Sequence, residues 1–216
     1  MSKMQAHIKS ETKEVMQNYF RQWRRVPLET SQWQSVFRTH KNLGPRKLMV
    51  DAINKKCRSV LNCGCGIATN RDLYTTQYYG VDVTPKFIME ARRTGADAGV
   101  ASILHLPFKD SAFDCVCCEN VLIHLPPKLW RSALDEMFRV ASRMVCMNEP
   151  VWKAETRYSV KERYFNEAGL FLIWLNDYGA EDMVDYLRTK GVGRHEVWFH
   201  KGLDWQVTIL NLDAKA

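Results

Sequence analysis

Long apolar runs are missing from this sequence of 216 residues, and its first residues, MSKMQAHIKSETKE, contain no apolar stretch. A helix that spans a membrane needs about 20 predominantly apolar residues, and a secretion signal has an apolar segment near its N-terminus. We therefore expect a cytoplasmic protein without a membrane partner. Internal repeats and low-complexity segments are also missing, and the length fits one domain with appendages.

Histidines at zinc-ligand spacing are missing too, although the chain contains seven cysteines. An odd number of cysteines without an export signal indicates reduced thiols. Cys63-x-Cys65 and Cys115-x-Cys117-Cys118 lie in apolar, strand-like runs, in which cysteine acts as a small hydrophobic residue. Because no histidine stands near them at the spacing of a zinc site, we predict no metal centre.

Acidic residues are scarce at the beginning of the chain. Residues 1–48 contain ten Lys or Arg and three Asp or Glu, whereas residues 49–216 contain 21 of each, so the N-terminal part carries the whole net charge of +7. A basic arm attracts nucleic acid, an anionic surface or an acidic substrate. We favour a solvated helical face instead, because no RNA-recognition motif or lysine-rich run accompanies it.

The stretch 59–82 contains the pattern that is most informative about function. The apolar run 59–63 breaks at GCG (64–66), and YGVD (79–82) follows. This order predicts a buried strand, a glycine turn, a helix and a second strand that ends in a carboxylate. In a parallel sheet it builds a site for an adenosine-type ligand, in which Asp82 accepts hydrogen bonds from ribose hydroxyls.

The dinucleotide pattern GxGxxG is incomplete, because Ala68 and Thr69 follow Gly66. The third glycine and the helix N-terminus of that pattern serve a pyrophosphate. An adenosine ligand that carries an amino acid therefore fits better than a dinucleotide. The alternative is that Gly64 and Gly66 only form a tight turn. We disfavour it because the later segments of the chain follow at the spacing that this type of sheet requires.

Alternating strand and helix patterns continue to the end of the chain. We expect helices at residues 10–24, about 30–39, 46–56, 85–93, 127–141 and 181–190. We expect strands at residues 59–63, 78–82, 98–102, 113–118, 144–147, 195–200 and 204–210. The alternation predicts an α/β fold: a doubly wound, mostly parallel, seven-stranded sheet with an antiparallel closing strand. Residues 46–216 form this domain, behind a basic helical arm or lid, residues 1–45.

Three stretches make the chain resemble the class I S-adenosylmethionine-dependent methyltransferases, particularly the small-molecule type, over roughly residues 45–212. VLNCGCGIA (60–68) resembles the glycine motif of the family, and YYGVDVTPKFIMEAR (78–92) resembles its second strand and the following helix. ASILHLPFKDSAFDCVCCENVLIHLP (101–126) resembles its adenine-side loop and fourth strand. The family usually has an acidic residue where Asn62 stands, a glycine where Ala68 stands, and often Asp where Ser102 stands.

The resemblance implies S-adenosylmethionine as the cofactor. Val83 would pack on the adenine, beside Ser102 and Ile103. Glu119 would approach the methionine part or the substrate, with a helix cap or a salt bridge as the alternative. The cofactor-binding residues that we expect are Asn62, Gly64, Cys65, Gly66, Asp82, Val83, Ser102, Ile103 and Glu119.

Methyl transfer is an in-line displacement that depends mainly on alignment, and it needs a base only when the nucleophile arrives protonated. His124, just past the expected strand 113–118, is the first candidate base. Asp177 is the second candidate, as a base or an amine anchor. A structural role is the alternative for each, and for Asp177 this is a turn or a cap.

Two variable parts of the chain flank this expected site. The segment 151–178 is rich in aromatic residues and shows no regular pattern; we expect a substrate wall or a cation–π surface there, or else a satellite core. From the N-terminal side, Tyr19, Trp23 and Arg46 would close the site as a lid. The alternative, which we favour slightly, is an amphipathic helix that packs on the domain.

The sequence therefore predicts a methyltransferase that acts on an O, N or S nucleophile of a small molecule. Two alternatives remain open. One is an RNA or tRNA methyltransferase that grips phosphates with the basic arm. The other is a non-catalytic protein that binds S-adenosylmethionine.

Overall fold

The structure is a computed structural model, and it describes residues 21, 23–24, 44–126, 129–157, 160–165, 169–174, 176–192, 195–199 and 205–212. Arg21 and Trp23 have helical backbone, as the helix predicted at 10–24 requires. The rest of that helix, the helix expected near 30–39, and Tyr19 lie outside the described residues. Across the ranges given above, no helix is both long and apolar enough to cross a membrane.

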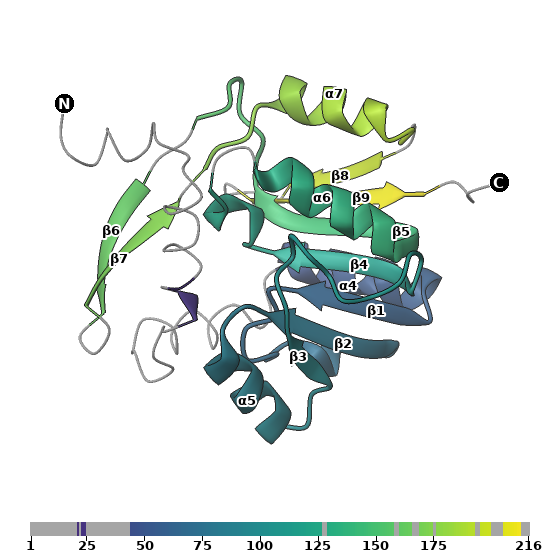
Figure 1. Cartoon of the computed structure of the whole chain (residues 1–216). Coiled ribbons are helices and arrows are strands. Elements are labelled where there is room, and N and C mark those ends of the chain that lie inside the picture. The colour runs from purple at the N-terminus through teal and green to yellow at the C-terminus, as the bar shows by residue number, and fades with distance from the viewer. Residues whose placement is uncertain are drawn as a thin grey trace.

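Helices and strands alternate along the described chain (Figure 1). The helices are α4 (Gly44–Lys56), α5 (Pro85–Arg93), α6 (Leu129–Val140) and α7 (Ala180–Thr189), with 3₁₀ turns η1 (Arg71–Leu73) and η2 (Leu122–His124). The strands are β1 (Ser59–Cys63), β2 (Gln77–Asp82), β3 (Ala98–Val100), β4 (Phe113–Glu119), β5 (Ala141–Pro150), β6 (Val160–Phe165), β7 (Gly169–Trp174), β8 (His195–Phe199) and β9 (Trp205–Asn211).

Seven strands form one sheet in the order β3-β2-β1-β4-β5-β9-β8. Strands β1 to β5 pair in parallel, and β9 is antiparallel to both β5 and β8. The predicted mostly parallel, seven-stranded sheet with an antiparallel closing strand is therefore confirmed. The strand order reverses between β1 and β4, and ligands of open α/β sheets bind at the carboxyl edge of such a point.

The central strands are buried on both faces, which is why they read as continuous apolar runs. On one face, Leu61 and Val116 pack with residues of α6 and α7, such as Leu134. On the other face, Val60 and Cys115 pack with residues of α4. Figure 1 shows α4 and α6 on opposite sides of the sheet.

The helix predicted between the first two strands is wrong, because the structure has only the three-residue turn η1 there. Ala68 has a left-handed backbone, with φ 54°, and a right-handed helix cannot pass through such a residue. Its amide donates to the Cys65 carbonyl, and its own carbonyl accepts from the Arg71 amide. The chain therefore crosses from β1 to β2 through successive tight turns.

The segment 151–178 is also more regular than the sequence suggested. Strands β6 and β7 pair as an antiparallel hairpin that forms a separate two-stranded sheet. Figure 1 shows this hairpin beside the seven-stranded sheet. Strand β5, expected at 144–147, is longer than predicted, and β3 stops before Ser102.

Candidate functional site

The glycine turn after β1 is bound directly to the end of β2. The amides of Gly64 and Cys65 donate to the Val81 carbonyl at 2.7 and 3.0 Å, and the Gly66 amide donates to Asp82 Oδ2 at 3.0 Å. Gly64 and Gly66 have φ values of 72° and 56°, in the left-handed region that glycine adopts without strain. The predicted turn and the predicted carboxylate therefore meet at one edge of the sheet.

Glycine at position 64 is required by contact as well as by backbone angle. A Cβ atom there would lie 2.3 Å from Cγ2 of Val121, in the segment that follows β4. No real pair of carbon atoms tolerates this distance, so any side chain at position 64 displaces the turn or the segment. The close approach links the turn after β1 to the segment that contains His124.

Asp82 has acceptor capacity left for a ligand. Its Oδ1 accepts from the Thr84 amide at 2.8 Å, and its Oδ2 accepts from the Gly66 amide at 3.0 Å. Each carboxylate oxygen can accept a further hydrogen bond, which is what two ribose hydroxyls require. Burial raises the pKa of Asp82, and the amides of Thr84 and Gly66 oppose that rise. Val83, the next residue, is half-buried.

The expected adenine-side residues lie where β3 gives way to a loop. Ser102 Oγ accepts from the Leu104 amide at 3.2 Å, and the Ser102 carbonyl accepts from the His105 amide at 3.0 Å. Ile103 is buried in the larger core cluster. The Ser102 hydroxyl therefore supports its own turn as an acceptor.

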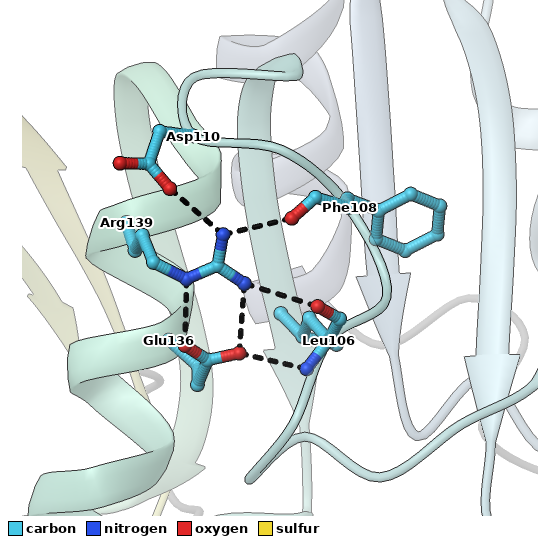
Figure 2. Close-up of polar contacts among 5 residues, drawn as sticks. All are labelled: Leu106, Phe108, Asp110, Glu136 and Arg139. Atoms are coloured by element: carbon cyan, nitrogen blue, oxygen red, sulfur yellow. Dashed lines mark hydrogen bonds and ion pairs between the residues drawn. The ribbon is translucent and has the colours of Figure 1, made fainter.

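Two side chains of α6, Glu136 and Arg139, form a clamp on the loop 104–112, which follows Ser102 (Figure 2). The sequence analysis did not predict this clamp. Arg139 on α6 donates to the carbonyls of Leu106 and Phe108 at 3.0 and 2.7 Å, and to Asp110 at 2.9 Å. It also donates to Glu136 through Nε and Nη2, at 2.7 and 2.9 Å, while Glu136 accepts from the Leu106 amide at 2.7 Å. Only the i,i+3 spacing of Glu136 and Arg139 was visible in the sequence.

Glu119, at the end of β4, joins three elements. Its Oε2 accepts from Arg46 Nε on α4 at 2.6 Å and from Asn148 Nδ2 on β5 at 3.1 Å, and its Oε1 accepts from Asn70 Nδ2 at 2.6 Å. The Arg46 and Glu119 side chains are only 10% and 7% exposed. The salt bridge that we kept as an alternative role of Glu119 is therefore present.

Buried acceptors near this network agree with the amino-acid part of the implied cofactor. The Oδ1 atoms of Asn62, Asn120 and Asn148 are buried and have no hydrogen-bond partner within the described portion of the chain. Buried polar atoms normally have a partner. An ammonium group brings three donors to such a place, so the residues present fit a ligand that ends in an amino acid.

His124 lies in η2, just beyond the end of β4, and contacts the N-terminal part of the chain. Its ring centroid is 5.8 Å from that of Trp23, with the two planes tilted by 45°. The Trp23 carbonyl accepts from Thr84 Oγ1 at 3.0 Å. Trp23 therefore reaches from the end of β2, beside Asp82, to the segment after β4.

Asp177 is placed differently from His124. Its main chain pairs in both directions with that of Arg157, at 2.9 Å for each hydrogen bond. Its neighbours contact the His124 segment: Asn176 donates through its amide to the Ile123 carbonyl, and Tyr178 donates to the Leu122 carbonyl. The two neighbours of Asp177 thus contact the residues just before the first candidate base, His124.

The seven cysteines are all buried and unpaired. Burial raises the pKa of the thiols at Cys63, Cys65, Cys115, Cys117 and Cys118, which keeps them protonated at neutral pH. A metal would need thiolates. In the part of the chain that the structure describes, no group of three or more His, Cys, Asp or Glu side chains has the arrangement of a metal site.

Comparisons with known proteins agree with this geometry. Residues 61–143 match the family model described as a methyltransferase domain. An uncharacterized protein of Methanocaldococcus jannaschii is 33% identical over 123 residues, which cover 55% of this chain and 50% of that protein. The human probable tRNA methyltransferase 9B is 27% identical over 150 residues, which cover 68% of this chain and 30% of that protein. The chain thus spans half or less of these relatives.

A solved structure shares the fold across most of the chain. It is a 1,6-didemethyltoxoflavin-N1-methyltransferase of Burkholderia thailandensis with bound 1,6-didemethyltoxoflavin and S-adenosylhomocysteine, at 16% identity and a TM-score of 0.60, covering 83% of this chain and 82% of that one. Other neighbours in fold were also solved with S-adenosylmethionine or S-adenosylhomocysteine. Residues 61–143 thus match a methyltransferase domain, and the chain shares its fold with methyltransferases that were solved with S-adenosylmethionine or S-adenosylhomocysteine.

Proposed function

We propose that this protein transfers a methyl group from S-adenosylmethionine to an O, N or S nucleophile of a small molecule. The observation that carries the proposal is the arrangement at the carboxyl edge of the sheet. Asp82 holds the glycine turn on one side, and His124 lies past the end of β4 on the other. Asp82, the proposed ribose acceptor, and His124, the candidate base, would thus lie at the two sides of the point where the strand order reverses.

The bound cofactor supplies a methyl group on a positively charged sulfur. The chain has to hold this methyl in line with the acceptor and remove a proton where the acceptor carries one. Asp82 would hold the ribose, and the network around Glu119 would border the amino-acid end. An unprotonated ring nitrogen of His124 would take the proton of the acceptor.

The position of Trp23 favours a small acceptor. Because its carbonyl is bonded to Thr84 and its ring faces His124, this residue crosses the edge between the two sides of the site. A cover of this kind leaves room for a small molecule more readily than for a folded RNA. The neighbour in fold that was solved with 1,6-didemethyltoxoflavin also acts on a small molecule.

A tRNA methyltransferase is the second candidate. Its support is the similarity to the human probable tRNA methyltransferase 9B and the excess of basic residues in the first 48 positions. Phosphate contacts by Lys and Arg make binding fall steeply with salt. If tRNA still binds at about 0.2 M salt, contacts between basic residues and phosphates alone would not explain the binding.

The first test is titration calorimetry of S-adenosylmethionine and S-adenosylhomocysteine with the wild type and Asp82→Ala. Asp185→Ala, which removes an exposed carboxylate paired with Arg188, is the matched control. We expect binding by the wild type and the control, and a loss of at least tenfold in Asp82→Ala. Equal affinity in all three proteins would refute the assigned role of Asp82.

The second test uses a labelled methyl group with separate pools of metabolites and tRNA. A labelled metabolite supports the proposal, whereas a labelled nucleoside after digestion of tRNA supports the second candidate. Tight cofactor binding without transfer to either pool would instead support a non-catalytic role.

A further inference from the structure

A buried carboxylate that the sequence analysis passed over holds the segment that contains His124. Glu149, near the end of β5, is 4% exposed. Its Oε1 accepts from the amides of Val121 and Leu122 at 2.8 and 3.1 Å, and its Oε2 accepts from the Ile123 amide at 3.2 Å. Successive amides that converge in this way form a site for negative charge. The geometry is therefore built for the ionised form of Glu149.

The carbonyls of the same segment are held from the opposite direction. Asn176 donates to the carbonyls of Ile123 and Leu125 at 3.0 and 2.7 Å, and Tyr178 donates to the Leu122 carbonyl. These donors stay the same throughout the physiological pH range, because an amide and a phenol do not change charge there. Glu149 is the part of this anchorage that can change charge.

The anchored segment borders both sides of the site. Val121, whose amide Glu149 binds, places its Cγ2 atom 2.3 Å from where a Cβ atom of Gly64 would lie. His124 follows directly after the three anchored amides, and its ring faces Trp23. A shift of this segment would therefore reach the glycine turn and the candidate base together.

We propose that Glu149 is a positioning residue of the methyl-transfer site: its ionised carboxylate holds the segment 121–124 against the glycine turn, and its protonation releases that segment. The proposal rests on the proposed function. It adds a pH-dependent switch in the fold, in which the acceptor side of the site is formed only when Glu149 is charged.

The surroundings of Glu149 place its titration near neutral pH. Burial raises its pKa to about 7, although the three amides and the Cys118 thiol oppose the rise. Cys118, with its Sγ atom 3.6 Å from Oε1, is the titratable side chain that contacts it, and burial also raises the pKa of that thiol. On β9, Gln206 lies opposite in the strand register and is neutral.

Protonation changes the anchor because a carboxylic acid is a weaker acceptor than a carboxylate. Oε2 accepts one hydrogen bond, from the Ile123 amide, so its second lone pair can take the added proton, and the resulting hydroxyl oxygen is the weaker acceptor. The amide anchorage of the segment is then weakened, while Asn176 and Tyr178 still hold its carbonyls.

The test follows the backbone amide resonances of Val121, Leu122 and Ile123 by NMR between pH 5.5 and 8.5. Histidine is the side chain that ordinarily changes charge in this pH range, and His124 adjoins the three amides, so the experiment is done in the His124→Ala background as well. We expect the three amides to move together with one midpoint near pH 7 in both proteins, and to show no such transition in Glu149→Gln. A midpoint that disappears in His124→Ala, or that persists in Glu149→Gln, would overturn the proposal.

Two further variants make the result specific. Glu136→Gln removes another carboxylate that accepts from a main-chain amide, that of Leu106, and should leave the transition at 121–123 unchanged. Glu149→Asp keeps a titratable group and should keep a transition with a shifted midpoint. If Glu149→Gln fails to fold, Glu149→Asp decides: an unshifted midpoint there would contradict the assignment.

Turnover then separates a positioning role from a merely structural one. We expect kcat of the wild type to fall at least tenfold from pH 8 to pH 6, and Glu149→Gln to stay at the low value throughout. Suppose that the pH transition of the three amides depends on Glu149, and yet Glu149→Gln is fully active. This result would overturn the positioning role and leave the proposed function intact. A wild type that binds the cofactor and transfers no methyl group would refute the proposed function, and with it the positioning role.

Discussion

Replacing Gly64 by Ala separates two reasons for a glycine in the turn after β1. The first is backbone strain, because Gly64 has φ 72°. The second is contact, because the added Cβ atom would lie 2.3 Å from Cγ2 of Val121. Gly191 offers a matched control: its φ is 68°, and a Cβ atom there would meet nothing within 4 Å. The two substitutions thus share the strain and differ in the contact.

The expected magnitudes follow from these two terms. A left-handed backbone costs an alanine about 1–2 kcal/mol, and the stiffer unfolded chain offsets about 0.4–1 kcal/mol of this. We therefore expect Gly191→Ala to lower the free energy of unfolding by about 1 kcal/mol. Overpacking adds about 1–3 kcal/mol, so Gly64→Ala should cost about 2–4 kcal/mol in total.

Urea unfolding of the single variants and of the double variant Gly64→Ala/Val121→Ala measures both terms. Val121→Ala removes the atom that would collide, so the double variant should be about 1–2 kcal/mol more stable than the sum of the single changes. Affinity for S-adenosylhomocysteine should fall about tenfold in Gly64→Ala and stay unchanged in Gly191→Ala. Equal costs at positions 64 and 191, without coupling to Val121, would refute the contact argument.

Three other substitutions test the site. Arg139→Ala should release the 104–112 loop, lower the free energy of unfolding by about 1–2 kcal/mol and weaken cofactor binding. Urea unfolding and calorimetry measure the two effects. Unchanged cofactor affinity would show that the clamp does not contribute to cofactor binding. His124→Ala should lower kcat about 100-fold and leave cofactor affinity within about twofold; equal loss of both, in kinetics and calorimetry, would argue against a base. For Glu149, burial outweighs the three amide hydrogen bonds and raises the pKa to about 7. The ionised form therefore holds the segment 121–124 at a cost in overall stability, and the contribution of Glu149 to the free energy of unfolding is larger at low pH and is lost as pH rises. Urea unfolding should therefore show the wild type losing about 2 kcal/mol relative to Glu149→Gln between pH 5.5 and 8.5, and a constant difference would contradict the shifted pKa.

The sheet was predictable because its strands are short apolar runs separated by turns. Strand β4, with the sequence FDCVCCE, has the pattern of a central parallel strand, and the structure places it between β1 and β5. The carboxyl ends of such strands meet at one edge. Gly64, Asp82 and Glu119 could therefore be assigned to that edge from their positions in the sequence alone.

Local patterns failed where backbone angle or long-range contact decides the outcome. The helix expected after Gly66 does not form, because Ala68 is left-handed. The hairpin of β6 and β7 was missed because Lys161, Glu162 and Arg163 interrupt the apolar pattern of the first strand. The anchors formed by Glu149 and Arg139 join residues 26 to 33 positions apart, so no short window of sequence contains both partners.

The departures from the family motif at Asn62, Ala68 and Ser102 leave the geometry of the turn intact. Ala68 keeps the left-handed angle that a glycine would have, and it completes the turns on either side of it. Asn62 donates to the Tyr78 hydroxyl at 3.2 Å, and Ser102 Oγ accepts from the Leu104 amide at 3.2 Å. Ala68 and Ser102 therefore support their own turns and Asn62 contacts Tyr78, while the hydrogen bond from the Gly66 amide to Asp82 remains in place. Because the Gly66 amide already holds Asp82, we expect these replacements to change the affinity for the cofactor and not its position.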